Sequence, residues 1–86
     1  MPWFVYVLRS IGYGRYYVGS SERPASRLEE HNRGKVNSTK AYLPWEICYL
    51  EEHPSRVEAC RRERYIKGRK SRAWIESQLL GKDTGS

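Results

Sequence analysis

The amino-acid sequence predicts an α+β fold, in which a three-stranded antiparallel sheet is flanked by three helices in the order ββαβαα. Two observations indicate this class. Three short runs rich in aromatic and β-branched residues read as strands, and the remaining apolar residues have helical spacing without the regular alternation of strand and helix that builds a parallel sheet. A length of 86 residues fits one small domain, which we expect over residues 1–80.

The first two runs predict a β-hairpin. Trp3–Arg9 is dominated by aromatic and β-branched residues, which favour strands. Gly12 and Gly14 interrupt this character before it resumes over Arg15–Gly19. We therefore expect two antiparallel strands joined by a loop of several residues.

A helix is expected from about Arg23 to Asn32. Pro24 suits the first turn of a helix, and Ala25 and Leu28 supply an apolar side. Gly34 follows the last turn, where glycine commonly ends a helix.

A polar loop over residues 34–44 precedes the third strand, expected over Trp45–Glu51. Trp45, Ile47 and Tyr49 alternate there with Glu46, Cys48 and Leu50, so we expect the first three to share one face of the sheet.

Two further helices complete the chain. Ser55 and Glu58 have the spacing of a capping box, so a helix is expected from there to about Lys67, with Gly68 after it. Ser71 is the expected N-cap of the last helix. The apolar residues of that helix are Trp74, Ile75, Leu79 and Leu80.

The charge is unevenly distributed along the chain. The net charge is +6, which favours a polyanionic partner such as DNA. Residues 1–60 hold eight Lys and Arg against seven Asp and Glu, whereas residues 61–86 hold eight against three. A solvated helix face would explain part of this excess, and contact with nucleic-acid phosphates is the alternative. The candidate phosphate-contacting residues are Arg61, Arg62, Arg64, Lys67, Arg69, Lys70 and Arg72.

Cysteine usage and hydropathy exclude several classes. Cys48 and Cys60 form no CxxC or Cys/His ligand spacing, so neither a zinc site nor a disulfide framework is expected, and a reducing, cytoplasmic location fits. The apolar runs are short and interrupted by charges, which argues against membrane insertion and secretion. Residues 81–86 are expected to form a short flexible tail.

One carboxylate falls on the wrong side of its helix. Glu63 lies on the apolar arc formed by Ala59, Cys60 and Ile66, and an ionised carboxylate facing a core is costly unless it is paired, hydrogen-bonded or bound to a metal. An i,i+4 ion pair with Lys67 would leave it as a satisfied rim residue. The alternative is a ligand for a hard divalent cation such as Mg²⁺.

Four other residues supply groups that phosphodiester hydrolysis requires. That reaction needs a base or water-orienting group, a cation that offsets charge on phosphorus oxygens, and a metal. Tyr6 and Tyr17 lie on the paired strands, and Arg27 and His31 project from one side of the next helix at i,i+4 spacing. Each alone has an ordinary explanation, because tyrosines are common packing residues in strands and exposed Arg and His are frequent on helices.

Several segments together resemble the GIY-YIG nuclease family, in particular its small single-domain members, over residues 3 to about 80. The matching segments are Phe4-Val5-Tyr6, Tyr17-Val18-Gly19, the helix segment Arg27–Asn32, Pro44-Trp45 and Glu58–Lys67. Phe4 replaces the glycine of the first triplet, and Ser20 stands where some members carry a lysine. Ser77 and Gln78 occupy a region where some members have an asparagine.

The resemblance implies a divalent-metal nuclease. Tyr6, Tyr17 and Arg27 would lie beside the scissile phosphate, Glu63 would bind a single Mg²⁺ or Mn²⁺, and His31 would assist proton transfer. No small-molecule cofactor is implied.

The sequence therefore favours a metal-dependent endonuclease that acts on DNA, in repair or recombination. A non-catalytic nucleic-acid-binding module is the alternative, and a protein-interaction domain is a third possibility for which the sequence offers no dedicated surface. Pure binding has no use for a carboxylate near a phosphate, so Glu63 favours the enzyme. The sequence leaves the oligomeric state open.

Overall fold

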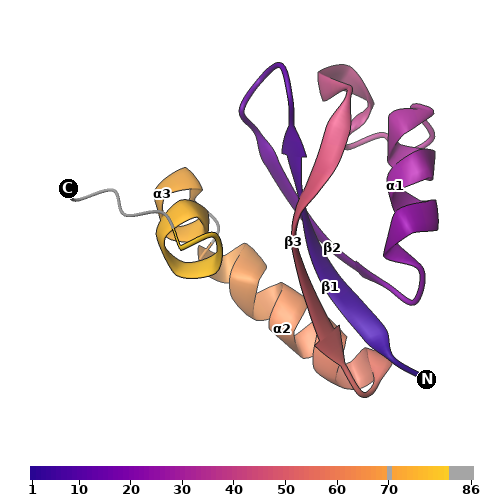
Figure 1. The fold of residues 1–86 in the computed structure, drawn as a ribbon, viewed down its shortest axis with the longest axis vertical. Coiled ribbons are helices and arrows are strands. Elements are labelled where there is room, and N and C mark those ends of the chain that lie inside the picture. Colours follow the sequence, from indigo (N-terminus) through magenta and orange to yellow (C-terminus); the bar gives the residue numbers. More distant parts are fainter. Residues whose placement is uncertain (70, 82–86) are drawn as a thin grey trace.

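The computed structural model describes residues 1–69 and 71–81 and confirms the α+β class (Figure 1). Its elements, in chain order, are β1 (Trp3–Ser10), β2 (Tyr16–Ser21), α1 (Pro24–Asn32), a 3₁₀ turn (Lys40–Tyr42), β3 (Trp45–His53), α2 (Arg56–Arg69) and α3 (Arg72–Trp74), which continues as a π-helical turn (Ile75–Leu79). The expected order ββαβαα is therefore present.

The three strands form an antiparallel sheet in the order β2-β1-β3, with the first strand at its centre. Figure 1 shows α1 on one face of this sheet and α2 on the other, with α3 beyond the end of α2. Because helices cover both faces, β1 is buried on both sides, and its residues Val5 to Leu8 have at most 1% of their surface exposed.

Successive side chains of a strand point to opposite faces, so β1 contributes to two separate clusters. Val5 and Val7 pack beneath α2 together with Ala59 and Ile66. Tyr6 and Leu8 pack on the α1 side, where the other buried member is Trp45. This alternation aims Tyr6 at α1, where the candidate site forms.

A bulge in β3 overturns part of the expected alternation. Val7 lies opposite Tyr49 and Leu8 opposite Ile47, so Cys48 is an extra residue on this strand. Ile47 consequently packs on the α1 side, whereas Tyr49 packs with the α2-side cluster. The prediction that these two residues share a face was wrong, because one inserted residue shifts every later side chain to the other face.

Glycine ends one helix as expected and not the other. Gly34 has φ +76° after α1, and its amide donates to the carbonyl oxygen of His31 at 3.0 Å. Gly68 stays inside α2, which runs on to Arg69. Ser71 is the N-cap of the last helical segment, as predicted: its backbone is extended and its side chain accepts a hydrogen bond from the Trp74 amide.

None of the helices in the described ranges is long and apolar enough to cross a membrane. Residues 82–86 of the expected flexible tail lie outside the described residues.

Candidate active site

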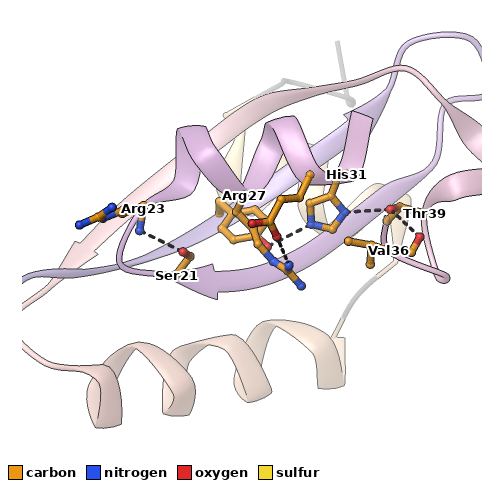
Figure 2. A network of polar contacts seen from close by, with 8 residues as sticks. Ser21, Arg23, Arg27, His31, Val36 and Thr39 are labelled. Atoms are coloured by element: carbon orange, nitrogen blue, oxygen red, sulfur yellow. Dashed lines mark hydrogen bonds and ion pairs between the residues drawn. The ribbon is translucent and has the colours of Figure 1, made fainter. Parts of the chain in front are cut away.

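The predicted catalytic residues gather around the edge strand β2. Tyr6 and Tyr17 come from the hairpin strands, and the ring of His31 on α1 lies 6.1 Å and 4.9 Å from their ring centroids, respectively. Arg27 is one turn earlier on α1 and points to the same side of this helix (Figure 2). Glu63 approaches from α2 on the other face of the sheet and is hydrogen-bonded to Ser20 of β2.

Gly19 gives the Tyr6 phenol room to reach this edge. The two residues are direct partners in the β1–β2 register, so the phenol ring lies across the backbone of the edge strand. A Cβ atom at position 19 would sit 2.6 Å from the Tyr6 hydroxyl oxygen and 2.7 Å from the carbon that carries it. A side chain at this position would therefore displace the phenol.

If the site has the phosphodiesterase activity that the sequence predicts, we expect Gly19→Ala to reduce that activity by a factor of about 10 to 10², because a displacement of the phenol by about 1 Å would disturb the reacting geometry. The crowding should also destabilise the fold by about 1–3 kcal/mol. Gly68→Ala is the matched control, because a Cβ there meets nothing within 4 Å and alanine favours the helix. Parent-level turnover in Gly19→Ala would show that the phenol position is unimportant.

Tyr6 begins a buried chain of hydrogen bonds. Its hydroxyl oxygen lies 3.2 Å from Nε2 of His31, and Nδ1 of the same ring lies 2.8 Å from Oγ1 of Thr39. The Thr39 hydroxyl in turn donates to the carbonyl oxygen of Val36 at 3.3 Å, and Figure 2 shows these last two steps. Tyr6, His31 and Thr39 are at most 1% exposed, so all three side chains of this chain are buried.

The electrostatics keep the buried Tyr6–His31 pair neutral. Burial, and then the neighbouring Tyr17, raise the pKa of Tyr6 to about 12, although the charge on Arg27 acts in the opposite direction. Burial, and then the positive charge of Arg27, lower the pKa of His31 below its ordinary value. At neutral pH the site therefore holds a protonated phenol beside an uncharged imidazole.

Arg27 supplies a cation at the rim of this pair. Its guanidinium forms an ion pair with Glu30 at 2.5 Å, and 39% of the Arg27 side chain remains exposed. The hydrogen bond to Glu30 raises the pKa of Arg27, so the charge is permanent. Part of the guanidinium thus remains available to an anionic ligand beside Tyr6.

The structure contains the Glu63–Lys67 ion pair that one of the two interpretations expected, and metal binding by Glu63 stays a prediction. Its carboxylate accepts from Ser20 Oγ at 2.6 Å and pairs with Lys67 Nζ at 2.7 Å, which is the expected i,i+4 partner. Its side chain is 19% exposed at the open edge of the sheet. Within the described ranges, no group of three or more His, Cys, Asp or Glu side chains is placed to hold a metal ion. A single carboxylate at an open edge is the kind of ligand through which Mg²⁺ is commonly bound, with water molecules completing its coordination.

A groove of about 640 Å³ continues from this edge. Tyr17 and Lys67 lie at its active-site end, and its walls also carry Arg15, Tyr42 and Arg72. The guanidinium of Arg15 is stacked 4.2 Å from the centroid of the Tyr42 ring, which holds this cation in place. The groove offers positive charge and aromatic surface next to the catalytic candidates.

The basic residues predicted to contact phosphates are divided among different surfaces. Lys67 and Arg72 line the groove beside the site. Arg62 forms an ion pair with Glu51 at 3.0 Å. Lys70 lies outside the described residues.

The other members of the basic set lie away from the groove walls. Arg61 and Arg64 line a different hollow on α2, together with Arg56. Arg69 is stacked over the ring of Tyr65, 4.5 Å from its centroid. The α2 helix thus spreads its charge around its exposed sides.

Sequence reasoning missed two residues that complete the site. Thr39 lies in the stretch expected to be an ordinary polar loop, and nothing in the sequence connects it with His31 eight residues earlier. In the sequence Ser20 is only a departure from the family pattern, whereas in the structure its hydroxyl donates a hydrogen bond to Glu63. The first contact joins α1 to the start of the 3₁₀ turn, and the second joins β2 to α2.

The fold and site define a small catalytic domain that presents tyrosines, an arginine, a histidine and a carboxylate along one sheet edge. The chain belongs to the GIY-YIG family, since the model of the GIY-YIG catalytic domain matches residues 2–76. This membership confirms the resemblance found in the sequence and places the chain among nucleases.

Two kinds of relative accompany this match. A UPF0213 protein of Streptococcus sanguinis is 38% identical over 65 residues, which cover 74% of each chain. The structure-specific endonuclease subunit SLX1 of Phaeosphaeria nodorum is 38% identical over 60 residues, which cover 63% of this chain and 16% of that protein. The solution NMR structure of the UPF0213 protein BH0048 from Bacillus halodurans is 29% identical, with a TM-score of 0.53 over 90% of this chain and 81% of that chain.

Proposed function

We propose that this protein is a divalent-metal-dependent endonuclease that hydrolyses phosphodiester bonds in DNA. The observation that carries the proposal is the gathering of Tyr6, Tyr17, Arg27, His31 and Glu63 at one edge of the sheet. The family match supports nuclease chemistry, and the similarity to an SLX1 structure-specific endonuclease subunit supports DNA as the substrate. The expected setting is DNA repair or recombination in the cytoplasm.

In this proposal Tyr6 is the group that activates water. Its phenol is protonated at neutral pH, so it needs an acceptor before it can take a proton from water. Nε2 of His31 is placed to be that acceptor. Tyr17 has no such acceptor among the hydrogen bonds of the described residues. Its ring instead contacts the ring of His31 and lies beneath the ammonium group of Lys67.

Arg27 and Glu63 would stabilise the negative charge that develops during the reaction. The exposed guanidinium of Arg27 would offset the charge that grows on the phosphate oxygens as water adds to phosphorus. Glu63 would hold Mg²⁺ or Mn²⁺, which when bound supplies positive charge to the attacking or leaving oxygen. Lys67 would shift from Glu63 toward the phosphate in that state.

The proposal is tested by incubating the purified chain with branched, flapped, nicked and linear DNA in Mg²⁺ or Mn²⁺. We expect cleavage of at least one of these substrates, abolished by EDTA and restored by excess Mg²⁺. Binding without cleavage under every metal condition would favour the alternative of a non-catalytic nucleic-acid-binding module.

The groove beside the site predicts where the DNA backbone runs. We expect the double variant Arg15→Gln/Arg72→Gln to weaken DNA binding and to reduce the slope of log affinity against log salt by about two units, one for each lost phosphate contact. Fluorescence anisotropy between low and moderate salt measures both quantities.

The matched control for the groove variant is Arg61→Gln/Arg64→Gln, which removes the same charge from the other hollow on α2. Its effect on the slope should be smaller. If both double variants reduced the slope of log affinity against log salt equally, the DNA would also contact α2 through Arg61 and Arg64. The charge distribution of the sequence is compatible with that outcome.

A further inference from the structure

We propose that Thr39 is a positioning residue that fixes the tautomer of His31, so that the unprotonated Nε2 faces the Tyr6 hydroxyl. This inference rests on the proposed function for the use of that arrangement. The arrangement itself rests on hydrogen bonds within the described residues.

The direction of the chain follows from its last member. A carbonyl oxygen only accepts hydrogen bonds, so the 3.3 Å contact with Val36 forms only when Thr39 donates its single hydroxyl proton to it. The Thr39 oxygen, at 2.8 Å from Nδ1 of His31, is then left as an acceptor. A neutral imidazole carries one proton, which this contact places on Nδ1.

The consequence for Tyr6 is a defined proton acceptor. With the imidazole proton on Nδ1, Nε2 has a free lone pair directed at the Tyr6 hydroxyl, 3.2 Å away. Transfer breaks the O–H bond of Tyr6 and forms an N–H bond at Nε2, which gives a phenolate and an imidazolium. The imidazolium keeps its Nδ1 hydrogen bond to Thr39, and the phenolate can take a proton from water. The other tautomer would place a proton on Nε2 and block this transfer.

The surroundings hold Thr39 rigidly in this role. Its own carbonyl oxygen accepts from the indole Nε1 of Trp45 at 2.8 Å, and Trp45 is 4% exposed. The amides of Thr39 and Lys40 both donate to the Val36 carbonyl, at 3.1 Å and 3.0 Å, which closes the turn that presents the hydroxyl. A buried hydroxyl that is hydrogen-bonded both to a histidine nitrogen and to a backbone carbonyl is typical of groups that orient the imidazole, so that its other nitrogen faces the site.

The first test measures the tautomer directly in the parent protein. Long-range ¹H–¹⁵N correlation spectra distinguish a protonated from an unprotonated ring nitrogen, and the chain has only one other histidine, His53, which a His53→Gln variant assigns. We expect His31 to be protonated on Nδ1 and unprotonated on Nε2 at neutral pH. A proton on Nε2 would overturn the inference, whether or not the protein cleaves DNA.

The second test compares two substitutions at the same position. Thr39→Ser keeps the hydroxyl and should retain the tautomer and turnover within about threefold of the parent. Thr39→Val keeps the shape and removes the acceptor, so kcat should fall by about 10- to 100-fold with little change in KM, and the Nδ1 signal should change. Parent turnover in a folded Thr39→Val protein would contradict the role of Thr39.

These results separate the inference from the proposed function. An inactive parent protein with the Nδ1-protonated tautomer would refute the endonuclease and leave the hydrogen-bond arrangement standing. An active parent protein with the proton on Nε2 would support the endonuclease and refute the role of Thr39. If Thr39→Val fails to fold, the tautomer of the parent and the Thr39→Ser comparison still decide the question.

Discussion

Glu63→Gln is expected to lower the cleavage rate by about 10³-fold or more, which corresponds to the several kcal/mol that a catalytic metal contributes. The substitution keeps the volume and an oxygen that accepts from Ser20, and it removes the charge that a divalent cation requires. Weaker Mn²⁺ binding, measured by electron paramagnetic resonance, should accompany the lost activity. The fold should persist, because the ion pair with Lys67 is worth only a few tenths of a kcal/mol.

The control for this experiment is Glu58→Gln, which removes the same charge from an exposed position in the first turn of the same helix. It should leave the cleavage rate and Mn²⁺ affinity near those of the parent. Should Glu63→Gln cleave at the parent rate, the carboxylate would be a rim residue satisfied by Lys67, which is the alternative that the sequence left open.

Arg27→Ala is expected to lower kcat by about 10²-fold or more with a modest loss of DNA affinity. Its predicted partner is charge that appears only as the reaction proceeds, so the loss should fall on turnover rather than binding. Steady-state kinetics on one cleavable DNA, together with anisotropy in a metal that does not support cleavage, separate the two quantities.

Arg33→Ala is the matched control for Arg27→Ala. Arg33 follows α1, is 65% exposed and pairs only loosely with Glu29 at 3.8 Å. Its loss should barely affect turnover. If Arg27→Ala reduced affinity and turnover by equal factors, Arg27 would be an ordinary phosphate contact.

Local signals in the sequence determined the elements of the fold. Strand composition, Pro24 at the start of a helix, Gly34 at its end and the caps at Ser55 and Ser71 act within a few residues, and the structure has helix or strand boundaries near each of them. The position of Glu63 on an otherwise apolar arc was also visible, because helical periodicity alone places it there. The side-chain roles at this site remain predictions until the variants are measured.

Contacts between distant segments could be decided only by tertiary structure. The bulge at Cys48 depends on how β3 pairs with β1, and Gly68 remains helical although glycine often ends helices. The separation of Arg61 from Arg72 onto different surfaces depends on where α2 ends relative to the sheet.

The hydrogen-bond chain through Thr39 shows the same division most clearly. The sequence supplied Tyr6 and His31 as candidates from residue type and spacing. The selection of Thr39 from a polar loop required the 3₁₀ turn to pack beneath α1 and Trp45 to fix its carbonyl. Residue type and short-range spacing determine which groups are present, whereas long-range packing decides which of them face one another, because hydrogen bonds form only when donor and acceptor lie within about 3.5 Å.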